Sequence, residues 1–196
     1  MKALVTGGCG FIGSHIVDRL IKEEFEVIVI DNLSTGRLLN LDHHKNNSKL
    51  TIHIVDLTEY EKILPLFEGV DWVFHIAALA DIVPSIERPL DYHRANVDGT
   101  INVLECCRKW NVKRIIYAAS SSCFGIPDVF PTPETADIRP QYPYAVTKYL
   151  GEKYLMYWNE IYGLPVTSMR FFNVYGPRSR TSGPMERYLV FFLPRS

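Results

Sequence analysis

The chain has 196 residues, a length that suits one well-buried α/β domain and is short for two. Its composition, 47% apolar and 22% charged with a net charge of -1, is that of a globular protein with no attraction to nucleic acid or acidic membranes. No apolar stretch could span a bilayer and no signal-peptide layout precedes the first strand. We therefore expect a cytoplasmic protein with no nucleic-acid or membrane partner.

Short apolar runs alternate with longer amphipathic ones, which is typical of a parallel sheet with crossover helices. The runs rich in Val and Ile predict strands buried on both faces, at Lys2–Thr6, Glu26–Asp31, Thr51–Asp56, Asp71–His75, Arg114–Ala119 and Pro165–Arg170. The predicted helices are Phe11–Glu23, Glu59–Phe67, Leu90–Trp110 and Tyr144–Tyr162. This order predicts an α/β fold of the Rossmann type, a doubly wound parallel sheet with helices on both faces.

Two stretches are predicted to be loops. His43–Lys49 is polar and is expected on the surface, whereas Ile126–Pro143 contains five prolines and cannot be a continuous helix. The second loop lies between a strand and the helix at Tyr144, where it could border an active site.

Four cysteines show neither a C-x-x-C nor a Cys/His metal spacing: Cys9, Cys106, Cys107 and Cys123. We expect all four to be reduced residues of packing or loop type, and we predict no metal site.

The first strand leads through Gly7, Gly10 and Gly13 into a helix. One glycine permits a tight turn, another lets backbone N–H groups approach a pyrophosphate, and the third allows close helix–sheet packing. The helix N-terminus adds partial positive charge where a diphosphate would lie. The strand–turn–helix context favours a dinucleotide site over a merely structural turn.

Acidic residues end the second and third predicted strands. Asp31 lies 18 residues beyond Gly13, where a carboxylate can accept both adenosine ribose hydroxyls and repel a 2′-phosphate. This favours NAD, although Arg37 keeps NADP open. Asp56 is placed to meet the adenine edge or, equally, to serve as a helix cap or turn residue.

The fourth predicted strand ends in His75-Ile-Ala-Ala. Ala77 and Ala78 are small enough for a cofactor to lie against the backbone. For His75 we favour a structural role over an acid–base role, because no partner carboxylate and no metal-ligand spacing is visible.

Tyr144 and Lys148 have i,i+4 spacing, which places both on one face of a helix. A phenol has a pKa near ~10, and a nearby ammonium and nicotinamide cation would lower that pKa by stabilising the phenolate. The pair is therefore suited to moving a proton beside a bound dinucleotide during hydride chemistry on an alcohol or ketone.

Ser120, Ser121 and Ser122 follow the fifth predicted strand at the end where ligands of open α/β sheets bind. The G-x-S-x-G pattern of serine hydrolases is absent. One interpretation is a serine hydroxyl bonded to the reacting oxygen of the substrate and to the Tyr144 phenol; the other is a serine-rich turn.

Six motifs together carry a family resemblance: TGGCGFIG, the Asp31 of DNLSTG, HIAA, ASSSCFG, YAVTK and RFFNVYGPR. In this order they resemble the extended short-chain dehydrogenase/reductases and, more narrowly, the NAD-dependent sugar-nucleotide epimerase/dehydratase family. The resemblance runs from Met1 to about Gly183. It implies NAD as cofactor and a nucleotide sugar as substrate, with no metal.

The resemblance also implies roles for individual residues. Tyr144 would be the base, Lys148 would hold the nicotinamide ribose, and Ser120, five residues before Gly125, would be the catalytic Ser/Thr. The implied cofactor-binding residues are Gly7, Gly10, Phe11, Ile12, Gly13, Asp31, Asn32, Asp56, Leu57, Ala77, Ala78, Asn96, Tyr144 and Lys148. The implied substrate-binding residues are Ser121, Ser122 and Asn173.

Within the family, dehydratases and decarboxylases place acidic residues just after the catalytic Ser/Thr. Here Ser121 and Ser122 are uncharged, which favours a UDP-hexose 4-epimerase acting by reversible hydride transfer at C4 through a 4-keto intermediate. A dehydratase or decarboxylase of the same fold and a non-catalytic NAD-binding fragment remain as alternatives.

The resemblance implies a C-terminal substrate domain that is largely missing from this chain. We interpret 1–183 as the NAD-binding domain and Pro184–Ser196 as an aberrant, frameshifted tail. Relatives often carry a peptide similar to AYGAVFGVFLAQ here, and a reconstructed DNA sequence that encodes it yields PMERYLVFFLP when it is read one base later. We expect weak or absent turnover. By analogy, the long helices Leu90–Trp110 and Tyr144–Tyr162 would form a homodimer.

Overall fold

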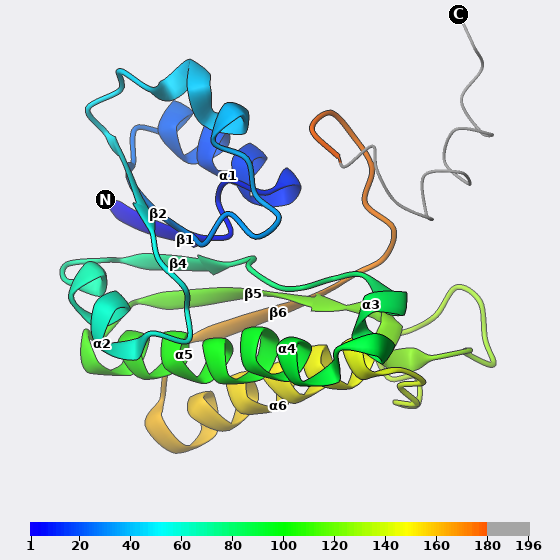
Figure 1. Cartoon of the computed structure of the whole chain (residues 1–196). Coiled ribbons are helices and arrows are strands. Elements are labelled where there is room, and N and C mark those ends of the chain that lie inside the picture. Colours follow the sequence, from blue (N-terminus) through cyan, green and yellow to red (C-terminus); the bar gives the residue numbers. More distant parts are fainter. Residues whose placement is uncertain (180–196) are drawn as a thin grey trace, which may run out of the picture.

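The computed structural model describes residues 1–179, in which six parallel strands form one sheet (Figure 1). The spatial order is β3-β2-β1-β4-β5-β6. The strands are β1 (Lys2–Thr6), β2 (Glu26–Asp31), β3 (Leu50–Ile54), β4 (Trp72–His75), β5 (Arg114–Ser120) and β6 (Val166–Phe171). The order reverses between β1 and β4, and ligands of such sheets bind at that switch point. The predicted Rossmann-type sheet is confirmed.

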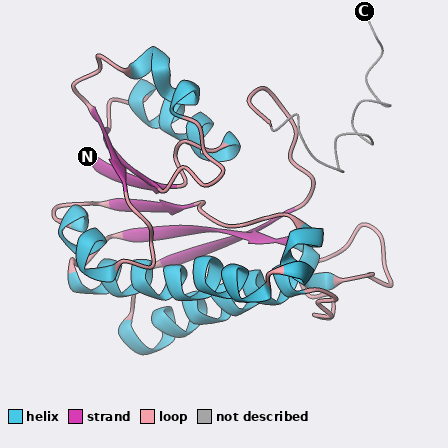
Figure 2. Cartoon of the chain, in the orientation of Figure 1, coloured by secondary structure: helices cyan, strands magenta, loops and turns pink. Residues whose placement is uncertain are grey.

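Helices cover both faces of the sheet. They are α1 (Phe11–Lys22), η1 (Leu38–His44), α2 (Tyr60–Ile63), η2 (Leu64–Phe67), α3 (Ile82–Glu87), α4 (Pro89–His93), η3 (Arg94–Asp98), α5 (Gly99–Lys109), η4 (Ser121–Phe124) and α6 (Pro143–Tyr162). In Figure 1, α1 lies on one side of the sheet, and α5 and α6 lie on the other. Figure 2, which is coloured by secondary structure, shows the strands side by side, with long loops at their ends.

Two hydrophobic clusters, one on each face of the sheet, hold these layers together. Strands β1 and β2 contribute side chains to both clusters. Ala3 and Val5 of β1 pack with Val17 and Leu20 of α1, whereas Leu4, between them in sequence, packs into the cluster that contains α5 and α6. Alternation along one strand thus supplies both layers.

Prolines explain where the helices differ from prediction. The predicted helix Leu90–Trp110 is instead α4, one π-helical turn η3 and α5, and Pro89 begins it. The separate helix α3 was not predicted; its Pro84 is tolerated because the first-turn N–H groups of a helix need no intrahelical partner. In the predicted helix Glu59–Phe67, the segment from Leu64 onward is 3-10 helix.

The prediction of a loop over His43–Lys49 is wrong for its first two residues, which end the 3-10 helix η1. The loop at Ile126–Pro143 is confirmed: apart from the first helical residue, Pro143, it contains no helix or strand. All four cysteines are free and buried, which agrees with a packing role.

Helix α6 has clear start and stop signals. Pro143 occupies its first turn, and Gly163 ends it in the left-handed conformation (φ 68°), with its N–H bonded to Asn159 O at 3.0 Å. Gly151, in the middle of α6, lets the helix approach β5, since a Cβ there would lie 2.4 Å from Tyr117 Oη.

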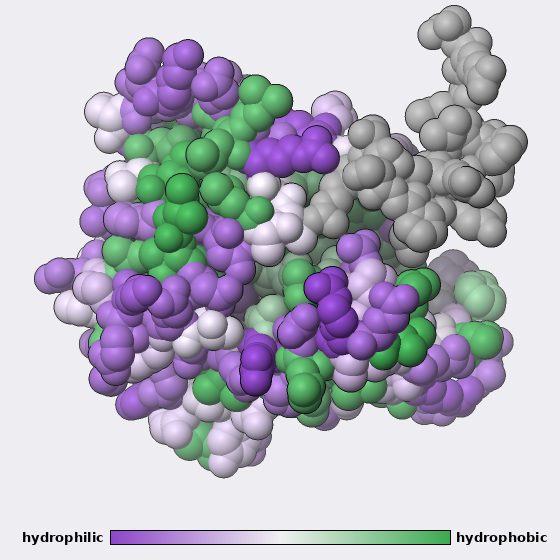
Figure 3. Space-filling view, in the orientation of Figure 1, coloured by the Kyte–Doolittle hydropathy of each residue, from purple (hydrophilic) through white to green (hydrophobic). Residues whose placement is uncertain are grey.

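The surface carries mixed hydrophilic and hydrophobic residues on the face drawn in Figure 3. Among residues 1–179, no helix combines the length and the apolar character needed to cross a membrane.

Replacing Gly151 with Ala should lower the free energy of unfolding by up to about 2 kcal/mol. Overpacking of the new methyl group against Tyr117 costs about 1–3 kcal/mol, and the preference for Ala over Gly inside a helix returns roughly 1 kcal/mol. Urea unfolding followed by circular dichroism measures the effect. The double variant Gly151→Ala/Tyr117→Phe removes the nearest atom and should recover part of the loss. A single variant as stable as the parent would contradict this packing.

Candidate active site

A cavity of about 870 Å³ opens at the carboxyl ends of β4, β5 and β6. Its walls include several residues to which the sequence assigned a function: Phe11, Ile12, Ala78, Ser120, Ser121, Ser122, Tyr144, Lys148 and Asn173. The carboxyl edge of the sheet therefore brings together residues that are up to 162 positions apart (11 to 173).

Tyr144 and Ser120 both line this cavity and lie next to one another. A hydrogen bond joins the Tyr144 phenol to Ser120, whose Oγ also lies 2.8 Å from Ser122 Oγ. Burial raises the pKa of Tyr144, and the bond to Ser120 opposes that rise. The pKa of this phenol is therefore raised, and the Lys148 ammonium, from which the sequence predicted a lowering, is not among the groups that shift it.

Lys148 is almost fully buried, at 3% exposed, one helical turn beyond Tyr144. Its Nζ lies over the Tyr117 ring, 4.3 Å from the centroid, and Tyr117 Oη donates to Lys148 O at 3.2 Å. Burial lowers the pKa of Lys148 to about 7, although the Glu152 carboxylate acts in the opposite direction. Tyr117 was missed in the sequence because it lies inside an apolar strand and has no motif of its own.

His75 is fully buried and bonded to two threonines, an arrangement that agrees with the structural role favoured from sequence. Thr6 Oγ1 accepts from the backbone N–H groups of Ile76 and Ala77, so its own hydrogen goes to His75 Nδ1 at 2.7 Å. His75 Nε2 then donates to Thr100 Oγ1 at 2.9 Å. Burial, aided by the positive charge of Lys148, lowers the pKa of His75 to about 3.

The side-chain amide of Asn96 is used for positioning. Its Oδ1 accepts from Leu79 N, and its Nδ2 donates to Leu79 O and to Thr147 Oγ1, at 2.8 to 3.0 Å. Thr147 Oγ1 in turn donates to Tyr144 O. Both amide hydrogens are therefore engaged in holding the segment after β4 against α6. Asn96 lies in the π-helical turn η3.

The glycine turn forms a cradle that side chains would fill. A Cβ on Gly13 would lie 2.1 Å from Gly7 O, and a Cβ on Gly7 (φ 68°) would lie 2.8 Å from the Ala77 backbone. Helix α1 begins after Gly10 with no side-chain cap and no acidic residue in its first turn. Its first N–H groups remain available to an anion, which fits the diphosphate of a dinucleotide.

The second group of predicted cofactor residues lies at the ends of β2 and β3. The Asp31 carboxylate accepts from Cys9 N at 2.9 Å and from Leu33 N at 2.8 Å, and burial raises its pKa. Asn32 Nδ2 donates to Asp56, whose other oxygen accepts both the N–H and the hydroxyl of Thr58.

One strand boundary here differs from prediction. Strand β3 ends at Ile54, so Asp56 lies two residues beyond it and closes a turn, as its alternative interpretation proposed. Leu57 is only 8% exposed and packs in the core cluster on the α5 side. Its side chain lies next to Gly99, the first residue of α5. A second hollow, of about 490 Å³ and lined by Met1, Lys2 and Glu26, holds none of the predicted site residues.

Comparison with known proteins decides the family. A model described as the NAD dependent epimerase/dehydratase family matches residues 3–191. The chain belongs to this family. It is 41% identical over 181 residues to a putative UDP-glucose 4-epimerase of Methanocaldococcus jannaschii, an alignment that covers 92% of this chain and 58% of the relative. The resemblance inferred from the motifs is thereby confirmed, with NAD as the cofactor of the family.

Three solved structures are similar over nearly the whole described chain. A UDP-N-acetylglucosamine 4-epimerase from Methanobrevibacter ruminantium, in complex with UDP-N-acetylmuramic acid, is 42% identical with a TM-score of 0.87 and covers 93% of this chain and 58% of its own. A Thermus thermophilus UDP-glucose 4-epimerase complex with NAD is 37% identical, with a TM-score of 0.88 and coverages of 97% and 61%. A dTDP-glucose 4,6-dehydratase double mutant from Streptomyces venezuelae is 29% identical, with a TM-score of 0.91 and coverages of 97% and 61%.

This chain therefore spans about 60% of the length of the proteins it matches. The tail Pro184–Ser196, which the sequence suggested is frameshifted, lies outside the described residues.

Replacing His75 with Gln should destabilise the protein more at about pH 7.5 than at about pH 4.5. The folded pKa of about 3 lies below the ordinary value of 6.5, so the unfolded chain binds a proton first as the pH falls. The parent then loses stability from about pH 6.5 downward, by at most about 1.4 kcal/mol per pH unit, and the variant lacks this loss. Urea unfolding of both proteins across this range measures the difference, and a constant difference would contradict a buried neutral imidazole.

Proposed function

We propose that this chain binds NAD along the carboxyl edge of its sheet and carries the acid–base residues of a nucleotide-sugar 4-epimerase. The glycine turn before α1 would hold the diphosphate, Asp31 the adenosine ribose, and Lys148 the nicotinamide ribose. NAD held by these residues would supply a reversible hydride acceptor for C4 of the sugar, by way of a 4-keto form of the substrate.

The residues of the chain supply the proton transfer and the positioning. Tyr144 would remove the proton of the C4 hydroxyl, and Ser120, already bonded to the phenol, would share that hydroxyl. Lys148 would stabilise the phenolate through its charge, because the two residues lie one helical turn apart on α6. Ala118, Ala119 and Phe171 give the cavity apolar walls beside these groups.

One observation favours an epimerase over a dehydratase or decarboxylase. In the described part of the chain, no carboxylate lines the cavity; its titratable lining residues are Tyr142, Tyr144, Lys148 and Tyr175. Elimination or decarboxylation needs a second acid/base, and Ser121 and Ser122 occupy the positions where relatives of those classes carry one. Asp81 acts on Tyr144 through its charge but is not part of the lining.

A UDP-hexose is the proposed substrate, with Asn173, Ser121 and Ser122 on its side of the cavity. The proposal includes a cytoplasmic location and a homodimer through α5 and α6, whose surface exposes Tyr154, Tyr157 and Ile161. It also treats 1–183 as the NAD-binding domain. Because the chain spans about 60% of its relatives, we propose that turnover by the 196-residue protein is weak or absent.

Replacing Lys148 with Met should weaken NAD binding at least about tenfold, because a charged hydrogen-bond donor to the ribose is lost. Met fills similar space and removes a buried charge, so the variant should remain folded. The matched control is Lys153→Met, on the exposed side of the same helix. Calorimetric titration with NAD measures both, and equal affinities would show that Lys148 does not contact the cofactor.

Incubation of the protein with NAD and UDP-glucose, followed by NMR of the sugar products, tests the reaction class. Any product should be UDP-galactose, formed slowly, and Tyr144→Phe should abolish it because the phenol is the base. Tyr154→Phe is the control, since that side chain lies farther along α6 and outside the cavity. A 4-keto-6-deoxy sugar or CO₂ would overturn the epimerase proposal, and rapid saturable turnover would refute the weak activity.

A further inference from the structure

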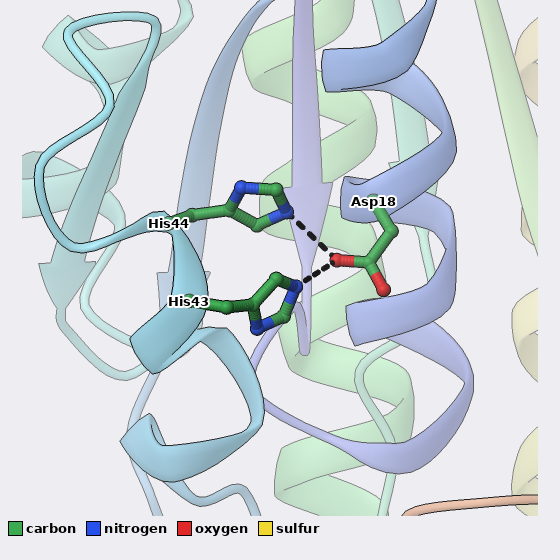
Figure 4. A group of neighbouring side chains, drawn as sticks. All are labelled: Asp18, His43 and His44. Carbon is green, nitrogen blue, oxygen red and sulfur yellow. Dashed lines mark hydrogen bonds and ion pairs between the residues drawn. The ribbon is translucent and has the colours of Figure 1, made fainter.

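Three side chains converge on one point, away from the cavity described above. Asp18 lies on α1, and His43 and His44 end the 3-10 helix η1 (Figure 4). Both imidazole Nε2 atoms donate to the same oxygen, Asp18 Oδ1, each at 2.8 Å. The two rings lie 4.1 Å apart between centroids, tilted by 43°. Across the described residues, this is the group of His, Cys and acidic side chains whose ligand atoms lie close enough to share a metal ion.

This set of donors fits a tetrahedral transition-metal ion. Zn²⁺ takes imidazole nitrogen and carboxylate oxygen at about 2.1 Å, which places neighbouring ligand atoms about 3.4 Å apart. The three ligand atoms already lie within 4.8 Å of one another, so a small opening of the group admits the ion. His43 is half-exposed, which leaves room for a water as the fourth ligand.

The surroundings select the class of cation. The Arg178 guanidinium lies 2.7 Å from Asp18 Oδ2, on the oxygen that the histidines do not use. It orients the carboxylate, as groups behind metal ligands do, and it shares the carboxylate charge. A site with two imidazoles and one shared carboxylate suits a metal that bonds strongly to nitrogen, and it is poor for Mg²⁺ or Ca²⁺, which need several oxygens.

We propose that Asp18, His43 and His44 bind one Zn²⁺-class ion as a structural site that is separate from the NAD and sugar sites. The ion would join α1 to η1. Through Arg178, and through His15, whose Nε2 contacts Pro177 O at 2.9 Å, the same face of α1 also holds the segment that follows Asn173. No ligand spacing in the sequence marks this group, because Asp18 lies 25 positions before His43.

The test uses the untagged 196-residue protein, freed of metal by a chelator and titrated with Zn²⁺ in a calorimeter. The expected result is one saturable site, together with a melting temperature that rises by about 2 °C or more in excess Zn²⁺. Co²⁺ should produce the visible absorption of a tetrahedral site with nitrogen ligands, and excess Mg²⁺ or Ca²⁺ should not displace either ion.

Two variants and one matched control locate the site. His44→Gln and Asp18→Asn should each lose saturable Zn²⁺ binding and the Co²⁺ spectrum, while circular dichroism shows that they remain folded. The control His93→Gln removes a histidine whose Nε2 lies 3.8 Å from a single carboxylate, Asp98, and it should bind Zn²⁺ as the parent does. Absence of binding by the parent, or equal binding by His44→Gln, would overturn the proposal.

Discussion

A run of buried hydrogen bonds connects the end of β1 to the start of α6, and the rest of the site is positioned by it. From Thr6 it passes through His75 and Thr100 to the backbone of Asn96. The Asn96 amide continues it to Thr147, which bonds Tyr144 O. Because buried polar groups are costly to leave unpaired, each member constrains the next, and the glycine turn is held in register with Tyr144.

The same burial explains the chemistry of Lys148. An ammonium enclosed by protein loses its hydration, so its pKa falls to about 7. The Tyr117 ring beneath the ammonium and the Glu152 carboxylate both stabilise its charged form, which offsets part of the lost hydration. This arrangement exists because Gly151 lets α6 pack against Tyr117 Oη. A glycine with no catalytic role of its own thus places the charged group beside Tyr144.

The residues of the proposed proton transfer, on α6, and those of the proposed metal site, on α1 and η1, belong to opposite faces of the sheet, but helix α1 connects the two sites. Helix α1 begins at the glycine turn, and its later residues Asp18 and His15 contact the segment after β6. Asn173 and Tyr175 of that segment line the cavity. Occupation of the Asp18 site would therefore restrain the wall of the cavity without touching its reacting groups.

Much of the fold follows from local sequence. The strand pattern, the glycine turn and the Tyr144–Lys148 pair depend on alternation, turn chemistry and helical spacing, all of which act over a few residues. The bounds of β1 and β2 were predicted residue for residue, since their apolar runs end at a glycine turn and at Asp31. Helix α3 was not predicted because a proline such as Pro84 usually indicates a helix break, although proline is tolerated in the first turn of a helix.

The sequence by itself determined the sheet with its crossover helices, the family and the pair of residues suited to proton transfer, because these depend on short-range patterns. Only the tertiary structure decided that Tyr117 supports Lys148, that Asn96 holds the backbone after β4, and that Asp18 meets His43 and His44. These contacts join residues 17 to 31 positions apart, and their geometry is set by how helices pack on the sheet, which no local pattern records.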